Sequence, residues 1–361
     1  MRLILFILAF MISGIVSAQE YYLFLGTYTN KGKSEGLYVY RFNSQTGDFK
    51  KISTTASVNP SYVVPSNGGK YLFVANETGG KDPGQVSSFS FDAASGKLQF
   101  INKQESGGDD PCYVSIDATN KWVAIGNYSG GNLSIYPLQA DGSLGKAVQT
   151  IQHPGKSHVH SVVFTPDHHY LVVTDLGLDQ LSIYDFDPSK SKPLNEQART
   201  VSTKQGAGPR HIIFHKKLPF AYTIEELSGN VSAYAYKNGE LTPLQTVNSH
   251  PADFKGEIGS AAIRISPDGK FVYASNRGAS NTLSIFAIDQ QSGKLVSKGF
   301  QKTLGENPRD FNIDPTGNFL LVANEKTGNV VVFRRDKKTG LLKATGKTIS
   351  VPEPVNLVFL Y

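Results

Sequence analysis

The sequence predicts an all-β protein, a seven-bladed β-propeller with four antiparallel strands in each blade. The first observation is a repeat: in six segments a short apolar strand begins at one position and a second strand ends sixteen residues later. A fixed internal period indicates a repeat architecture. The paired positions are Ser61/Glu77, Cys112/Tyr128, His160/Leu176, Arg210/Glu226, Ala261/Arg277 and Arg309/Glu325.

The second observation is that every repeat has the composition of strands and turns. β-branched and aromatic residues dominate short segments that are bounded by Gly, Asn, Asp and Pro. No window has a sustained helical period. Four short strands recurring every ~50 residues are typical of propeller blades. The expected strands of the second repeat are 61–64, 71–75, 86–91 and 98–102; later second strands are expected at 122–126, 170–174, 220–224, 271–275 and 319–323, and third strands at 133–136, 181–184, 231–234, 283–286 and 330–333.

The third observation is that the two ends of the chain are complementary fragments of a blade. The N-terminal fragment has strand-like segments at 22–27, 37–42 and 49–53 but lacks a first strand, and 354–360 is a first strand without a blade. Val355 and Tyr28 form the seventh, split pair. Joining the fragments completes a seventh blade and removes exposed edges, so we expect a C-terminal inner strand to close the N-terminal blade.

The first eighteen residues have the pattern of a cleaved signal peptide. Arg2 is followed by the apolar run 3–12 and by the small residues Val16-Ser17-Ala18. The apolar run is shorter than the ~20 residues of a membrane-spanning helix. We therefore expect cleavage after Ala18, a periplasmic or secreted location, no membrane span, and a single propeller domain over 19–361. Cys112 is the only cysteine, so no intrachain disulfide can form.

The charge pattern favours a small-molecule ligand. The formal net charge is +6, and the lysines are scattered through turns. Such a surface does not support nucleic-acid binding but is compatible with a small anionic ligand. The glycine pairs Gly79-Gly80 and Gly130-Gly131 precede no helix, which excludes a phosphate-binding P-loop. The oligomeric state is left open by the sequence.

The paired positions locate the candidate site. Adjacent first and second strands are antiparallel, so the start of one and the end of the other meet at the same end of the blade. Around the ring, the pairs line one mouth of the central channel, where a binding site is expected. Titratable groups gathered in a cleft favour a site. The candidate site residues at this mouth are His160, Arg210, Glu226, Arg277, Arg309, Glu77, Glu325, Tyr128 and His158, and the first four gather in one sector of the ring.

Alternative interpretations apply to several of these residues. Arg210 and Glu226 could form a partly buried structural ion pair. His158 and His160 could be metal ligands, but two histidines at this spacing are weak evidence and no carboxylate completes a ligand set, so we expect neither a metal nor a cofactor. Cys112 is expected to be a packed thiol. A polar position just before the variable one is expected to bond to backbone groups at strand ends: Asn76, Asn127, Asp175, Glu225, Asn276 and Asn324.

At these positions the chain resembles the bacterial lactonase family of seven-bladed propellers, which includes propeller-type 6-phosphogluconolactonases and carboxy-muconate lactonising enzymes. The resemblance spans the chain from Gln19 onward. It is specific in the combination of its motifs, which include 26–29 (GTYT), 74–77 (VANE), 127–131 (NYSGG), 206–211 (GAGPRH), 275–280 (SNRGAS) and 307–310 (NPRD).

The resemblance implies that a lactone ester in a carboxylated or phosphorylated substrate is hydrolysed or formed without a metal. The family's set of a His, an Arg, a Glu and a second Arg falls onto His160, Arg210, Glu226 and Arg277. The arginines would hold the developing oxyanion. Either Glu226 or His160 would activate water, and the other would protonate the leaving oxygen. These four would be the catalytic residues. Arg309 would bind an anionic group of the substrate, and the further substrate-binding candidates are Glu77, Glu325, Tyr128 and His158.

The export signal departs from the cytoplasmic role of a 6-phosphogluconolactonase, because its substrate is made in the cytoplasm. An exported enzyme acting on an unphosphorylated aldonolactone would use the same residues. Three rivals remain open: a non-enzymatic binding or surface propeller, a lactone-forming cycloisomerase, which would need the same groups, and a metal-dependent propeller lactonase.

Overall fold

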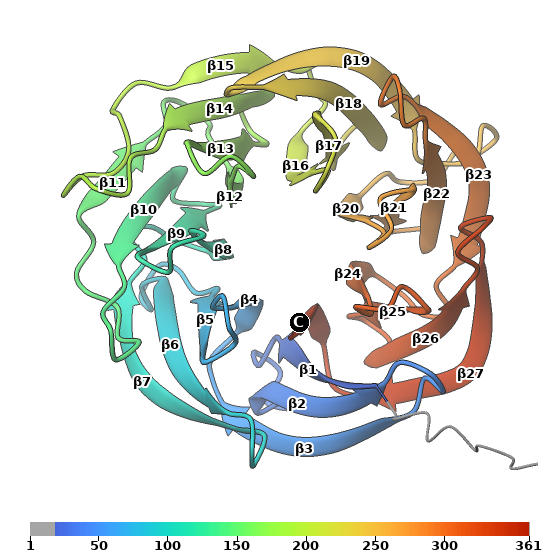
Figure 1. Ribbon diagram of the computed structural model, residues 1–361, viewed down its shortest axis with the longest axis horizontal. Coiled ribbons are helices and arrows are strands. Elements are labelled where there is room, and N and C mark those ends of the chain that lie inside the picture. Colours follow the sequence, from blue (N-terminus) through green and yellow to red (C-terminus); the bar gives the residue numbers. More distant parts are fainter. Residues whose placement is uncertain (1–18, 361) are drawn as a thin grey trace, which may run out of the picture.

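Seven four-stranded antiparallel sheets form a closed ring around a central channel (Figure 1). The computed structural model describes residues 19–360, and every element in that range is a strand. The predicted seven-bladed propeller is confirmed. The expected signal peptide, residues 1–18, lies outside the described residues. No helix in the described part of the chain is long and apolar enough to cross a membrane.

Each blade runs from an inner strand at the channel to an outer strand at the rim. The inner strands are β4 (Pro60–Pro65), β8 (Pro111–Ile116), β12 (Val159–Phe164), β16 (Pro209–Phe214), β20 (Ser260–Ile265), β24 (Pro308–Ile313) and β28 (Pro354–Phe359). The second strands are β1 (Glu20–Thr27), β5 (Tyr71–Asn76), β9 (Trp122–Asn127), β13 (Tyr170–Asp175), β17 (Phe220–Glu225), β21 (Phe271–Asn276) and β25 (Phe319–Asn324).

The two remaining strands of each blade lie progressively farther from the channel. The third strands are β2 (Gly36–Asn43), β6 (Gln85–Asp92), β10 (Asn132–Pro137), β14 (Gln180–Asp185), β18 (Asn230–Lys237), β22 (Thr282–Ile288) and β26 (Asn329–Arg335). The outer strands are β3 (Phe49–Ala56), β7 (Lys97–Glu105), β11 (Gln149–Gln152), β15 (Arg199–Ser202), β19 (Glu240–Asn248), β23 (Leu295–Lys302) and β27 (Leu342–Ser350).

The C-terminal strand β28 is the inner strand of the first blade, whose order is β28-β1-β2-β3. It pairs antiparallel with β1, with Leu357 opposite Leu25. The amide of Tyr28 donates to the carbonyl of Glu353 at 3.0 Å and extends the pairing toward the mouth. This is the predicted closure, in which the two ends of the chain share one sheet.

The core lies between blades, because each sheet buries apolar side chains on both faces. The junction of the first and last blades is an example. Phe42 is fully buried, and its ring centroid lies 5.7 Å from that of Phe319 and 5.4 Å from that of Phe359. Burying one such side chain stabilises a fold by roughly 1.5–3 kcal/mol. Repeated at each junction, this packing holds the blades at fixed angles to one another.

A β-bulge recurs near the mouth end of the inner strand in each blade. In the fifth blade Pro209 pairs with Glu225 and His211 pairs with Ile224, so Arg210 is an extra, unpaired residue. A bulge re-aims the side chain of its extra residue. The same shift in pairing occurs at Ser61, Cys112, His160, Ala261, Arg309 and Val355, the first members of the sixteen-residue pairs.

At five of the six predicted polar positions the side chain bonds to backbone groups at the strand ends, as predicted, and at Glu225 it does not. Asn276, for example, is fully buried and donates to the carbonyl of Ser249 at 2.7 Å. Asn76, Asn127 and Asn324 also donate to backbone carbonyls, and Asp175 accepts from the amide of His158. Glu225 differs, because it accepts from the hydroxyls of Ser228 and Ser232.

Candidate active site

Two arginines from neighbouring blades bind one carboxylate at the predicted mouth. Glu226 directly follows β17. Its Oε2 lies 2.8 Å from Arg210 Nε, and its Oε1 lies 2.9 Å from Arg277 Nη2. Burial raises the pKa of Glu226, but the two guanidinium groups lower it by more than burial raises it. The pKa of Glu226 is therefore below its ordinary value. At neutral pH the three side chains are therefore a carboxylate between two cations.

Arg210 is held rigidly, and its side chain is only 2% exposed. Its Nη1 donates to the carbonyl of Ala261 at 2.6 Å and lies 3.2 Å from His211 Nε2. Because a guanidinium can only donate, Nε2 of His211 is the acceptor. Burial lowers the pKa of Arg210 to about 10, so it remains charged at neutral pH.

His160 is buried beside this cluster as a neutral imidazole. Burial, followed by the charges of Arg210 and Arg309, holds its pKa well below the ordinary value. Its Nδ1 lies 3.7 Å from the Sγ of Cys112, which leaves Nε2 as the nitrogen able to face a ligand. Burial raises the pKa of Cys112. The thiol is therefore protonated and packed, as predicted.

A second ion pair lies across the mouth, between the seventh and second blades. Arg309 Nη2 is 3.1 Å from Glu77 Oε2, and the hydroxyl of Tyr28 donates to Glu77 Oε1 at 2.8 Å. The Arg309 guanidinium also lies over the Tyr28 ring, 5.1 Å from its centroid. The last candidate carboxylate, Glu325, accepts from the side-chain amide of Asn307.

Tyr128 and His158 form the wall beside His160. Their rings are stacked with centroids 4.4 Å apart, and His158 Nδ1 lies 3.1 Å from the carbonyl of Tyr128. The Tyr128 ring meets His160 edge-on at 5.6 Å. His158 and His160 thus share an aromatic neighbour. Among residues 19–360, no three His, Cys, Asp or Glu side chains are grouped as a metal site would require.

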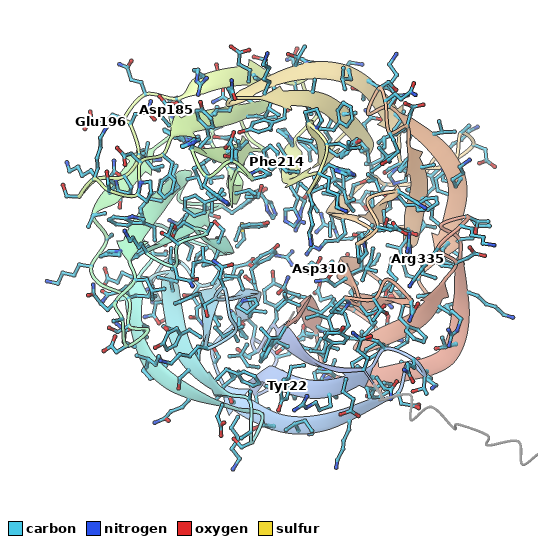
Figure 2. All side chains as sticks on the ribbon, in the orientation of Figure 1. Tyr22, Asp185, Glu196, Phe214, Asp310 and Arg335 are labelled. Atoms are coloured by element: carbon cyan, nitrogen blue, oxygen red, sulfur yellow. The ribbon has the colours of Figure 1, made fainter. Side chains whose placement is uncertain are left out.

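The contacts above place all nine candidate residues at the same mouth of the channel, where the inner strands begin and the second strands end. Side chains extend from the inner strands into the channel (Figure 2). Tyr28 and His211 also contact the cluster, but they were absent from the sequence-based candidates. Tyr28 belongs to the seventh pair, and that membership could have identified it. His211 directly follows a bulged residue, and only the altered pairing around Arg210 brings it to the guanidinium.

Comparison with known proteins gives a consistent result. A family model described as "Lactonase, 7-bladed beta-propeller" matches residues 22–359. The chain is 39% identical over 353 residues to a 6-phosphogluconolactonase of Bacillus subtilis, with 95% of this chain and 99% of that protein covered. It is 37% identical over 334 residues to a 6-phosphogluconolactonase of Formosa agariphila, with 89% and 94% covered. Among solved structures, the periplasmic gluconolactonase of Pseudomonas aeruginosa is 38% identical, with a TM-score of 0.90 and coverage of 95% and 99%.

Proposed function

This chain belongs to the seven-bladed β-propeller lactonase family and is a 6-phosphogluconolactonase-like enzyme, and from that premise we propose that it hydrolyses an unphosphorylated aldonolactone to the open hydroxy acid. The observation that carries the proposal is the Arg210–Glu226–Arg277 cluster beside the neutral imidazole of His160. Fixed cations next to a neutral base suit ester hydrolysis, in which an oxyanion forms while water loses a proton.

The arginines and the carboxylate have distinct roles in the proposed reaction. Glu226 spans both arginines and holds their donors in place. Arg210 and Arg277 retain N–H groups beyond those bonded to Glu226, because each guanidinium has five. These donors would bind the lactone carbonyl oxygen and stabilise the oxyanion. In other hydrolases, removing one such donor raises the activation free energy by ~3–4 kcal/mol.

His160 is the proposed acid and base. Both oxygens of Glu226 are engaged by guanidinium groups. In the neutral tautomer whose Nδ1–H faces the Sγ of Cys112, His160 would have its lone pair on Nε2. His160 Nε2 would take one proton from the attacking water as its oxygen bonds to the lactone carbon. The same proton would then pass to the ring oxygen as the ring C–O bond breaks. This sequence leaves a hydroxy acid and restores the neutral imidazole.

The charge balance of the mouth favours an unphosphorylated substrate. Arg210, Arg277 and Arg309 are matched by three carboxylates, Glu226, Glu77 and Glu325, and His160 is neutral. A phosphate dianion would meet no excess positive charge there, and charge matching governs such recognition. The sequence suggested that Arg309 binds an anionic group. Because Arg309 is already paired with Glu77, we propose instead that the Arg309–Glu77 pair binds hydroxyls of the sugar.

The proposed location fits this substrate. Residues 1–18 have the pattern of a cleaved signal peptide, and one relative of known structure is named a periplasmic gluconolactonase. We therefore propose that the protein works in the periplasm or outside the cell, with no nucleic-acid partner, cofactor or metal in its reaction.

The direct test is acid release by the purified protein with glucono-1,5-lactone, its 6-phosphate and a muconolactone. We expect the unphosphorylated lactone to be turned over fastest. Glu226→Gln and Arg210→Ala should each lower kcat/KM at least ~100-fold, while Glu240→Gln on the exposed outer strand β19 should not. Circular dichroism checks that each variant is folded. Turnover of none of the lactones would favour a binding propeller, and equal turnover by wild type and both site variants would reject the assigned roles.

A further inference from the structure

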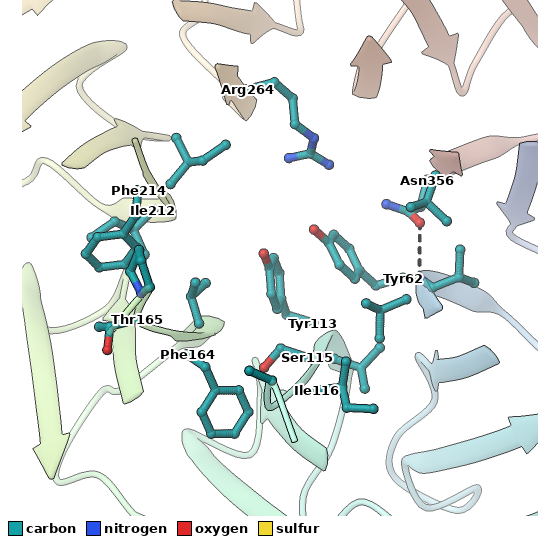
Figure 3. Close-up of a pocket in the computed structure, with 18 of the residues that line it drawn as sticks. Tyr62, Tyr113, Ser115, Ile116, Phe164, Thr165, Ile212, Phe214, Arg264 and Asn356 are labelled. Atoms are coloured by element: carbon teal, nitrogen blue, oxygen red, sulfur yellow. Dashed lines mark hydrogen bonds between the residues drawn. The ribbon is translucent and has the colours of Figure 1, made fainter. Parts of the chain in front are cut away.

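The end of the channel opposite the candidate active site holds a separate cavity (Figure 3). Its volume is about 480 Å³, within the range of ~300–1,000 Å³ that is usual for small-molecule sites. It is lined by the far ends of the inner strands, including β4, β8, β12 and β16. We call it the far cavity.

A layer of aromatic side chains separates the far cavity from the active-site mouth. Tyr62 and Tyr113 are stacked, with ring centroids 4.1 Å apart. His211 meets both edge-on, at 6.1 Å and 5.2 Å, and its other neighbour is His160, at 5.1 Å. Tyr62 and Tyr113 face the far cavity and His160 belongs to the mouth. The two ends of the channel are therefore different chemical environments.

The walls of the far cavity combine apolar and polar side chains, the polar ones including Asn67, Ser115, His168, Asn312 and Asn356. Ile116, Phe164, Ile212 and Phe214 line it on one side, and Leu357 of the closing strand lines it on the other. Aromatic and aliphatic walls favour an apolar ligand body. A hydroxyl of a polyhydroxylated sugar that lay against this apolar side would be left unpaired, at a substantial cost for each buried group.

The floor of the cavity presents hydrogen-bond donors. Arg264 Nη2 bonds Asp310 Oδ1 at 2.9 Å, and Nη1 donates to the carbonyl of Ile263 at 3.0 Å. A guanidinium has five N–H groups, so donors remain for a ligand. The hydroxyls of Tyr62 and Tyr113 point toward Arg264 (Figure 3). Burial raises the pKa of both phenols, which therefore keep their protons. The two hydroxyls are hydrogen-bonded to each other, so one of their two protons remains for a ligand.

Asp310, the partner of Arg264, is buried behind the cavity lining, and other donors also bind it there. Besides Arg264, it accepts from the side-chain amide of Asn356 at 2.6 Å and from the amide of Leu357 at 3.4 Å. Burial lowers the pKa of Arg264, but the Asp310 carboxylate and the phenols raise it more. The guanidinium thus stays charged, and the groups that face the cavity complement acceptor oxygens.

We propose that the far cavity is a binding site for a small carboxylic acid with an aromatic or branched aliphatic body. Because Asp310 balances the charge of Arg264, the carboxylate is recognised through directed hydrogen bonds and not through an excess of positive charge. The donors are the N–H groups of Arg264 that Asp310 and Ile263 leave over and the hydroxyl pair of Tyr62 and Tyr113. The apolar body lies against Phe164 and Phe214. This site does not depend on the reaction at the opposite mouth.

The test is calorimetric titration of the purified protein with 3-phenylpropionate and, as a matched neutral probe, 3-phenylpropan-1-ol. We expect the acid to bind at least ~tenfold more tightly than the alcohol, because the alcohol has no carboxylate to accept a charge-assisted hydrogen bond. Ile116→Trp should project an indole ring into the cavity and weaken binding. The double variant Tyr62→Phe/Tyr113→Phe should weaken it at least ~tenfold. Tyr71→Phe, whose hydroxyl bonds Ala140 on the outside of the molecule, is the control and should not change it.

The variant Arg277→Ala separates the two ends of the channel, because it alters only the active-site mouth and should leave binding of the acid unchanged. Absence of binding to the wild-type protein at millimolar concentration would overturn the proposal. So would equal binding by the double tyrosine variant. Binding that is lost in Arg277→Ala but kept in Ile116→Trp would assign the acid to the other mouth and would also overturn it. If Ile116→Trp does not fold, the double tyrosine variant decides.

Discussion

Arg277 Nη2 lies 2.9 Å from Glu226 Oε1, although the two residues belong to neighbouring blades. Arg277 follows β21 in the sixth blade, and Glu226 follows β17 in the fifth. The other carboxylate oxygen binds Arg210 within the fifth blade. The position of Arg277 relative to Arg210 is thus set by the packing between the two blades, and the closed ring acts as the support for the site.

The first prediction concerns the two contacts made by the planar guanidinium of Arg277. Its Nε donates to the carbonyl of Gly259 at 2.9 Å while Nη2 binds Glu226. Lysine keeps the charge but cannot hold both contacts in a fixed plane. Arg277→Lys should therefore lower kcat/KM for a sugar lactone by ~10²-fold, measured by acid release at constant pH. The control is Arg334→Lys on the outside of β26, and full activity of Arg277→Lys would contradict the role.

The residue repeat predicted the ring and the mouth because both follow from one local feature. Each first member of a sixteen-residue pair is the extra residue of a bulge, and its second member directly follows the neighbouring strand. Arg210 and Glu226 are therefore brought together inside one hairpin. Local sequence carries that information, since a hairpin contact depends only on the register of adjacent strands.

The second prediction is a pH dependence that follows from His160. The group acts as a base only when it is neutral, and burial lowers its pKa below the ordinary value of ~6.5. The neutral form therefore persists as the pH falls through 6.5. We expect kcat/KM to be constant from pH 8 to pH 6.5 and to decline only below that value.

The pH profile is checked by acid release, with spontaneous lactone hydrolysis subtracted at each pH. His160→Gln should retain only a small residual rate, and that rate should lack the acid limb of the wild type. An acid limb centred at or above pH 6.5 in the wild type would contradict a neutral, buried His160. An unchanged limb in His160→Gln would assign the titration to a different group.

Contacts between blades could not be predicted from the pattern. Arg309 and Glu77 are 232 residues apart in the chain, yet their side chains meet across the mouth. Their pairing depends on the closure of the ring and on the rotamers of both side chains, which no local repeat records. The far cavity was missed for the same reason. It is made by the ends of inner strands from several blades, at positions that looked like ordinary strand residues.

The third prediction tests the charge balance of the mouth. Glu77→Gln removes the carboxylate that faces Arg309 and leaves that guanidinium as an excess positive charge. The KM for glucono-1,5-lactone 6-phosphate should fall by about fivefold, because an unpaired cation attracts the phosphate. Kinetics with the unphosphorylated lactone should change less than about threefold. Equal effects on both lactones, or a wild-type preference for the phosphate ester, would contradict the assigned substrate class.

The fourth prediction concerns Asn356, which joins the closing strand to the blades on either side. Its Oδ1 accepts from the amide of Val63 at 3.0 Å, and its Nδ2 donates to Asp310 Oδ2 at 2.6 Å. Asn356→Ala leaves a buried amide and a buried carboxylate each short of a partner, which should lower the free energy of unfolding by about 1–3 kcal/mol. Urea unfolding followed by circular dichroism measures this loss.

The control is Asn195→Ala. Asn195 lies on an exposed loop, and its side chain bonds to nearby backbone groups, so its loss should lower the free energy of unfolding by less than about 1 kcal/mol. Equal effects of the two substitutions would show that the ring does not depend on this bridge, because the pairing of β28 with β1 would then suffice to keep it closed.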